Sequence, residues 1–140
     1  MIPKFRVWHH ELGRLMSVKC MFFQDSEIEE FELNDTLRND YITAYPDEIE
    51  LMQSTGLKDK NGKEIFEGDI VRTTRFLGRA DEIGGFYEYE KDYVGVVKVL
   101  EGSWVIDTGS VAVRLWSEID ESEVLGNIYE NPELLEVTHE

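Results

Sequence analysis

The sequence has few of the features that anchor, cross-link or export a protein. It contains a single cysteine, Cys20, in 140 residues, so an internal disulfide and a paired-cysteine zinc site are both excluded. One cysteine fits a reducing, cytoplasmic setting best. No apolar run approaches the roughly 20 residues that cross a bilayer, and the first residues lack the apolar stretch of a signal peptide. We therefore expect a soluble, cytoplasmic protein with no membrane partner.

Basic residues are also scarce. Lys and Arg number 14 against 30 Asp and Glu, which gives a formal net charge of −16. Such a surplus disfavours direct contact with phosphate backbones. Arg72, Arg75 and Arg79 are close in sequence, but Arg72 and Arg75 fall on opposite faces of a regular strand. Direct nucleic-acid binding is therefore not expected, whereas an acidic surface that attracts a basic protein partner is.

The acidic loop around residue 60 does not have the spacing of a calcium site. Asp59, Asn61 and Asp69 lie in a glycine-containing loop, as in an EF-hand. That loop needs glycine at its sixth position and a bidentate glutamate at its twelfth. Counted from Asp59, these positions are Glu64 and Ile70. We therefore predict no metal site here.

No nucleophile or transition-metal motif is present either. His9 and His10 are neighbours on an expected strand and so point to opposite faces. Cys20 is expected to be a buried, inert thiol, and His139 lies in the tail. The run 108–110, Thr-Gly-Ser, is typical of a hairpin turn. We predict no catalytic residue, no metal ligand and no cofactor.

Alternation of apolar and polar residues predicts a mainly β protein. Phe5 and Val7 share one side of a first strand, and residues 11–14 form a turn. The next strand follows, so residues 3–23 form an N-terminal hairpin. Its buried face is expected to consist of Met16, Val18, Cys20 and Phe22.

The pattern weakens after this hairpin and becomes clear again near residue 49. Ile28 and Phe31 are three apart, which allows a short helical turn. Further strands are expected around residues 49–51, 70–75, 93–100, 104–107, 111–116 and 124–129, separated by glycine-containing turns. Asn131 and Pro132 begin a short C-terminal helix as cap and first position. The three tryptophans, Trp8, Trp104 and Trp116, are expected in the core. Short strands at close spacing indicate a strongly curled antiparallel sheet or a small barrel.

Residues 77–92 break the regular strand spacing and are expected to form a long loop or an extended hairpin. Phe86, Tyr87 and Tyr89 lie there among acidic residues, with Asp92 at the end. Exposed aromatics surrounded by charge are typical of an interface hot spot. These four residues are our predicted partner-binding site. The alternative is that the aromatics pack on their own domain or on a sister subunit.

Three blocks of the sequence resemble the YopX family of phage and prophage proteins. The blocks are KFRVW at residues 4–8 with RLM at 14–16, LMQSTGLKDKNGKEIFEGDIV at 51–71, and VLGNIYENPELL at 124–135. The resemblance implies a β-rich single domain over residues 1–140 with an SH3-like barrel core at roughly 48–135, on which the hairpin 3–23 packs. It supplies no catalytic residues. Residues 77–92 match no motif of the family.

We therefore expect a non-enzymatic, phage-encoded protein-interaction module that binds a basic host or phage protein. One alternative is a divalent-metal-dependent hydrolase or nuclease-like accessory enzyme, which a thermal shift with Mg²⁺, Mn²⁺ or Ca²⁺ would reveal. Another is a small barrel that binds nucleic acid directly, with salt-dependent affinity. Exposed sheet edges further predict homo-oligomers.

Overall fold

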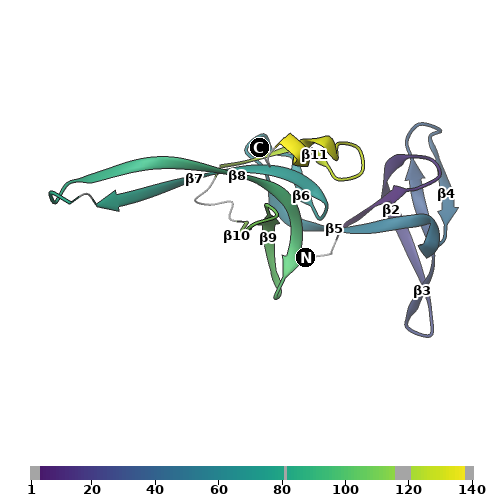
Figure 1. The fold of residues 1–140 in the computed structure, drawn as a ribbon. Coiled ribbons are helices and arrows are strands. Elements are labelled where there is room, and N and C mark those ends of the chain that lie inside the picture. Colours follow the sequence, from purple (N-terminus) through teal and green to yellow (C-terminus); the bar gives the residue numbers. More distant parts are fainter. Residues whose placement is uncertain (1–3, 81, 116–120, 138–140) are drawn as a thin grey trace. The chain divides into compact units, whose positions relative to one another are not determined.

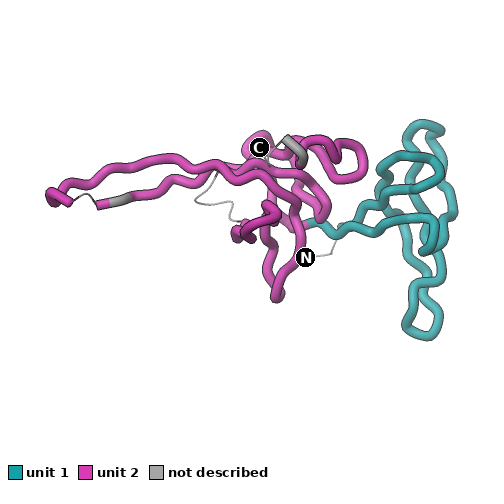
Figure 2. The backbone as a smooth tube through the Cα atoms, in the orientation of Figure 1, with its two compact units in different colours: residues 1–54 teal, residues 55–140 magenta. Residues whose placement is uncertain are grey.

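The computed structural model describes residues 4–80, 82–115 and 121–137. The chain divides into two compact units, Met1–Ser54 and Thr55–Glu140, which Figure 2 shows in two colours. Each unit is described by itself. No helix within the described residues is long and apolar enough to span a membrane.

The first unit is an antiparallel meander followed by a return strand (Figure 1). Its elements are β1 (Phe5–His9), β2 (Arg14–Gln24), β3 (Glu27–Asp35), β4 (Asp40–Ala44), the 3-10 turn η1 (Pro46–Glu48) and β5 (Ile49–Lys58), which continues into the second unit. With β6 (Glu64–Phe66) these strands form a six-stranded sheet in the order β4-β3-β2-β1-β5-β6. Its core is a cluster of buried side chains: Val7, Met16, Phe31, Leu33, Ala44 and Ile49.

The short helical turn that the spacing of Ile28 and Phe31 allowed does not form, because both residues lie in strand β3. Along this strand Phe31, Leu33 and Asp35 are buried while the residues between them are partly exposed. This period of two is that of a sheet with one covered face. Acidic residues at positions of the same parity as Phe31 and Leu33, namely Glu27, Glu29 and Asp35, masked the alternation in the sequence.

The predicted buried face of β2 is correct only for its first half. Met16 and Val18 contribute to the core, but the pairing with β3 shifts between Val18 and Cys20. An extra residue at such a bulge turns the following side chains to the other face. Met21 therefore packs on the core, Cys20 is only partly buried, and Phe22 is exposed.

The second unit contains a five-stranded antiparallel sheet in the order β10-β9-β8-β7-β11. Its elements are β6 (Glu64–Phe66), β7 (Asp69–Ala80), β8 (Phe86–Leu100), β9 (Ser103–Asp107), β10 (Ala112–Arg114), β11 (Glu121–Asn127) and α1 (Glu133–Val137). The core residues are Ile65, Val71, Val97, Ile106 and Leu115, with Leu57, Trp104 and Val124 packed against them.

The mainly β class and the short C-terminal helix are confirmed, but the barrel is not. Closure requires the two outermost strands of a sheet to pair. Among the described residues, β10 pairs with β9 and β11 pairs with β7, so the five-stranded sheet stays open. The single-domain prediction, with the hairpin 3–23 packed on the rest, stays a prediction.

Several turns and core positions agree with the sequence. Gly62, with a φ of 82°, occupies the tight turn before β6, and Glu101-Gly102 joins β8 to β9. Trp104 packs against the second core and Trp8 is partly buried. Trp116 lies outside the described residues.

Candidate interaction surface

Strands β7 and β8 extend beyond the rest of their sheet as a two-stranded ribbon (Figure 1). Strand β11 pairs with β7 only from Asp69, which is opposite Asn127, to Thr74, which is opposite Glu121. Strand β9 pairs with β8 only from Val96 onward. Pairing between β7 and β8 nevertheless continues out to Ala80 and Phe86. We call residues 75–91, which are paired only with one another among the described strands, the arm. Of the two alternatives predicted for residues 77–92, a long loop or an extended hairpin, the structure shows the extended hairpin.

Side chains on the arm hold the two strands together. At its base, the Thr74 hydroxyl donates a 2.8 Å hydrogen bond to the carboxylate of Asp92 on the opposite strand. Near its tip, the ring of Phe86 lies over Gly78, so close that a Cβ atom at residue 78 would be 2.9 Å from ring atom Cε2. An aromatic ring that covers a glycine on a neighbouring strand is a known device for stabilising a ribbon.

The pairing register gives the arm two chemically different faces. Residues opposite one another share a face, and successive residues alternate between faces. The even-numbered face carries an acidic row from β8, made of Glu88, Glu90 and Asp92. Opposite this row, β7 contributes Gly78, Phe76 and Thr74, none of which is a cation.

The odd-numbered face combines aromatic and basic residues. The Lys91 ammonium lies 5.2 Å from the centre of the Tyr93 ring, and the Arg75 guanidinium lies 5.8 Å from it. Tyr87 and Tyr89 are neighbours, with ring centres 6.0 Å apart. Cations over rings are weakly attractive at exposed sites, so these contacts order the face without covering it.

The arm concentrates exposed hydrophobic side chains. Phe86 is 69% exposed, Tyr87 47% and Tyr89 40%, and Phe76 and Ile83 are exposed as well. Three of the four predicted partner-binding residues are thus exposed aromatics. They do not form one patch, because Phe86 and Asp92 lie on the even face while Tyr87 and Tyr89 lie on the odd face. The sequence analysis missed Phe76, whose place on the arm follows only from the strand register.

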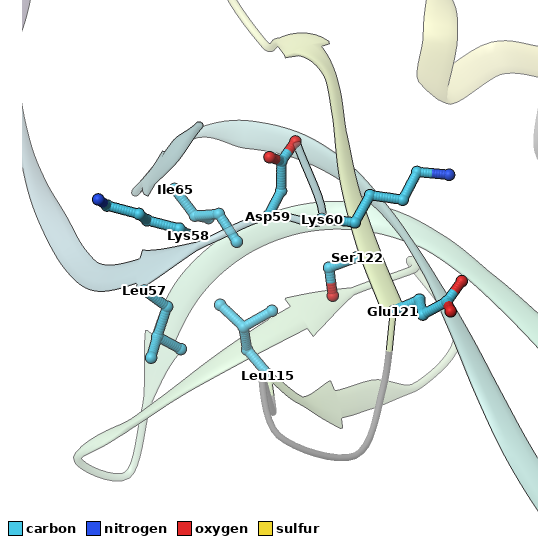
Figure 3. Close-up of a pocket in the computed structure, with 8 residues that line it drawn as sticks. All are labelled: Leu57, Lys58, Asp59, Lys60, Ile65, Leu115, Glu121 and Ser122. Atoms are coloured by element: carbon cyan, nitrogen blue, oxygen red, sulfur yellow. The ribbon is translucent and has the colours of Figure 1, made fainter. Parts of the chain in front are cut away.

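A small pocket of about 170 Å³ in the second unit is the competing candidate (Figure 3). It is lined by Leu57, Lys58, Asp59, Lys60, Ile65, Leu115, Glu121 and Ser122. The side chains of Lys58 and Lys60 extend away from one another at its rim. The Ser122 hydroxyl is 2.7 Å from that of Thr73, and both residues are buried.

Asp59, one of the two carboxylates that line this pocket, is held by hydrogen bonds of the fold. Its oxygens accept hydrogen bonds of 2.9 Å from the main-chain N–H groups of Asn61, Lys63 and Val124. Burial alone would raise the pKa of Asp59, but these three N–H donors outweigh it and hold the pKa below its usual value. The carboxylate ties the turn after β5 to β11, so we interpret it as structural.

Asp35 is the corresponding buried acid of the first unit. The Arg14 guanidinium donates two hydrogen bonds to it, of 2.8 and 3.0 Å. This hydrogen bonding lowers the pKa of Asp35 against the opposing effect of burial. Asp35 also lines an open hollow with Ser17, Asn34 and Tyr41 among others. A carboxylate locked to arginine at the end of β3 again serves the fold rather than chemistry.

The residues of the rejected metal motifs are not brought together. His9 accepts a hydrogen bond from the Leu12 N–H at 3.2 Å, whereas His10 lies 3.3 Å from Glu50. Asp69 accepts a hydrogen bond from the Phe66 N–H. Over the described part of the chain, no three His, Cys, Asp or Glu side chains are grouped as metal ligands would be.

The sequence and the fold were compared with those of known proteins. The family model described as "YopX protein" matches residues 4–136. The chain belongs to the YopX family. Its YopX fold is also similar to two solved structures. One is protein EF1440 from Enterococcus faecalis, with 26% identity over 96% of this chain and 99% of that chain and a TM-score of 0.58. The other is protein yopX from Bacillus subtilis, with 21% identity over 94% of this chain and 96% of that chain and a TM-score of 0.54. A comparison with curated proteins found no match.

The YopX sequence blocks fall on the body of the molecule rather than on the arm. The block at residues 51–71 covers β5, β6 and the start of β7, and the block at 124–135 covers the end of β11 and the start of α1. In the latter block, Asn131 accepts a hydrogen bond from the Asn127 N–H. These YopX motifs specify turns and strand contacts. The arm contains none of the three blocks.

Proposed function

We propose that this YopX-family protein is a non-enzymatic interaction module that binds a protein partner through its arm. The observation that supports the proposal is the exposure of several large aromatic side chains on a ribbon with which no third strand pairs among the described residues. Exposed apolar groupings of this kind usually mark contact sites in soluble proteins. Three buried carboxylates, Asp35, Asp59 and Asp69, are engaged in hydrogen bonds that hold the fold together.

Aromatic residues give the arm the means to bind. A buried tyrosine or phenylalanine removes roughly 150–250 Å² of surface from water, and tyrosine is enriched among residues that dominate binding energy. Phe86 and Tyr87 are adjacent at the tip but point to opposite faces. A partner that wraps the tip, or that enters beside β8, can therefore bury both rings.

The charge of the chain suggests the nature of the partner. A net charge of −16 attracts a basic protein over distances longer than any contact and repels acidic ones. We propose that the partner is basic, and that a phage or its host supplies it. We also propose self-association, through sheet edges such as β10 and β4 that pair with only one other strand in the described part of the chain.

Replacing Phe86 and Tyr87 with alanine is expected to abolish partner capture. The affinity-tagged chain and its Phe86→Ala/Tyr87→Ala variant are used to capture proteins from cells that express them, and the captured proteins are compared by quantitative mass spectrometry. Loss of two such anchors costs about 2 kcal/mol or more each, so the specific partners should fall by at least about tenfold.

A Phe23→Ala variant is the matched control. Phe23 is also a largely exposed aromatic residue on a β-hairpin, but it lies in the first unit. This variant should capture the same proteins as the unmodified chain. If the double arm variant also captures them undiminished, the arm is not the binding element and the proposal is wrong.

A further inference from the structure

The outer edge of β8, which faces away from β7, is open along residues 86–93. Strand β9 begins to pair with β8 only at Val96, and no other described strand pairs with residues 86–93. Every second residue of such an edge points its N–H and C=O groups outward. An extended segment of another protein can satisfy those groups by joining the ribbon as a third strand.

The side chains beside this edge specify what that segment should carry. Glu88, Glu90 and Asp92 form a row on one face, and the neighbouring residues of β7 supply no cation to neutralise it. In an added antiparallel strand, residues directly opposite share a face and lie close enough to interact. Lysine or arginine at alternate positions of the added strand would therefore pair with this acidic row.

The other face favours apolar residues in the same strand. Tyr87 and Tyr89 lie on either side of Glu88 in β8, and their exposed rings are adjacent on the odd-numbered face, where Lys91 follows them. Side chains opposite them would lie against these rings, where β-branched or aromatic residues pack well. The preferred strand thus alternates basic with apolar residues.

A second copy of the same edge does not meet this requirement. Pairing β8 with β8 of another copy about a two-fold axis places residues of the same acidic row opposite one another. Like charges directly opposite are destabilising in a sheet. The row therefore disfavours self-pairing at this edge while favouring a basic strand.

We infer that the outer edge of β8 is a docking site for an extended segment in which basic and apolar residues alternate, added to the arm as a third strand. The inference rests on the proposed function, since it names the part of the arm that binds and the chemistry of its partner. Main-chain hydrogen bonds along residues 86–93 supply the pairing. Glu88, Glu90 and Asp92 supply the specificity.

Designed peptides test this directly on the full chain. The probe is a fluorescein-labelled peptide in which lysine and valine alternate along a length that matches residues 86–93. The first comparison peptide has the same composition, with all lysines in one block. The second has the alternating sequence with N-methyl groups on alternate amides of its pairing edge. Fluorescence anisotropy should show the alternating peptide binding at least about tenfold more tightly than either.

A charge reversal on the protein completes the test. The Glu88→Lys/Glu90→Lys variant changes two exposed side chains, and circular dichroism checks that it stays folded. This variant should no longer bind the lysine–valine peptide. It should instead bind a peptide in which glutamate and valine alternate, which the unmodified chain does not bind. If the block peptide bound as tightly as the alternating peptide, net charge alone would account for the binding. If the N-methylated peptide bound as tightly, strand pairing would be excluded. Either result, or no binding at all, overturns the inference.

The proposed function is tested by a different result. If no peptide binds but the Phe86→Ala/Tyr87→Ala variant still loses its captured proteins, the arm binds its partner in another way and only the strand-edge inference fails. If capture survives that double variant, the proposed function itself fails.

Discussion

A Gly95→Val variant is expected to lose about 3 kcal/mol or more of unfolding free energy. Gly95 is buried in β8 where the chain leaving β9 passes directly over it. A Cβ atom at residue 95 would collide with the main-chain carbonyl of Asp107 and lie 2.9 Å from the nitrogen of Thr108. Main-chain atoms cannot move aside as a flexible side chain can, so the sheet itself must distort. Urea unfolding followed by tryptophan fluorescence measures the loss.

The comparison variant is Val99→Ala on the same strand. Val99 is 49% exposed, so its truncation should cost well under about 1 kcal/mol. If Gly95→Val is no more destabilising than this control, the close approach of the chain to β8 is not as described. The contact between β8 and the chain that follows β9 would then not hold the base of the arm in place.

Removing the arm is expected to abolish partner capture without unfolding the body. Thr74 and Asp92 are directly opposite in the ladder, so residues 75–91 can be replaced by Asn-Gly, the preferred two-residue hairpin turn. The segment removed contributes none of the residues of the second core cluster. The melting midpoint should therefore shift by only a few degrees, on the order of 1 kcal/mol. Capture is measured as for the alanine variants.

Two outcomes would contradict this prediction. A shortened chain that melts without cooperativity would show that the arm is part of the folding unit. A stably folded shortened chain that captures the same proteins would place the binding surface elsewhere, for example on the acidic surface of the body. The Phe23→Ala chain again serves as a folded reference with its arm intact.

The sequence was informative wherever a turn or a strict alternation determined the structure. Glycine-containing turns were predicted between the strands, and Gly62 and Gly102 lie in two of them, with the positive φ values that favour glycine. The long aromatic segment was also recognised as a possible hairpin. Its four named residues all lie on the ribbon or at its base.

Non-local pairing was what the sequence could not supply. The bulge after Val18 turned Met21 inward and left Cys20 only partly buried, and nothing in the local pattern marks that shift. The same limit explains why a barrel was predicted but an open sheet is found. Whether two edge strands meet depends on twist and stagger summed over a whole sheet. The strand register was also needed to show that Phe86 and Tyr87 lie on different faces of the ribbon.

Amide hydrogen exchange along β8 tests most directly whether the arm is an ordered ribbon with an open edge. In the free protein, amides of residues 86–93 that point toward β7 should exchange at least about tenfold more slowly than those that point outward. Slow exchange should therefore alternate along the strand. Uniformly fast exchange would mean that the ribbon does not form, and uniformly slow exchange that its edge is already covered. Either pattern would contradict this account of how the protein binds.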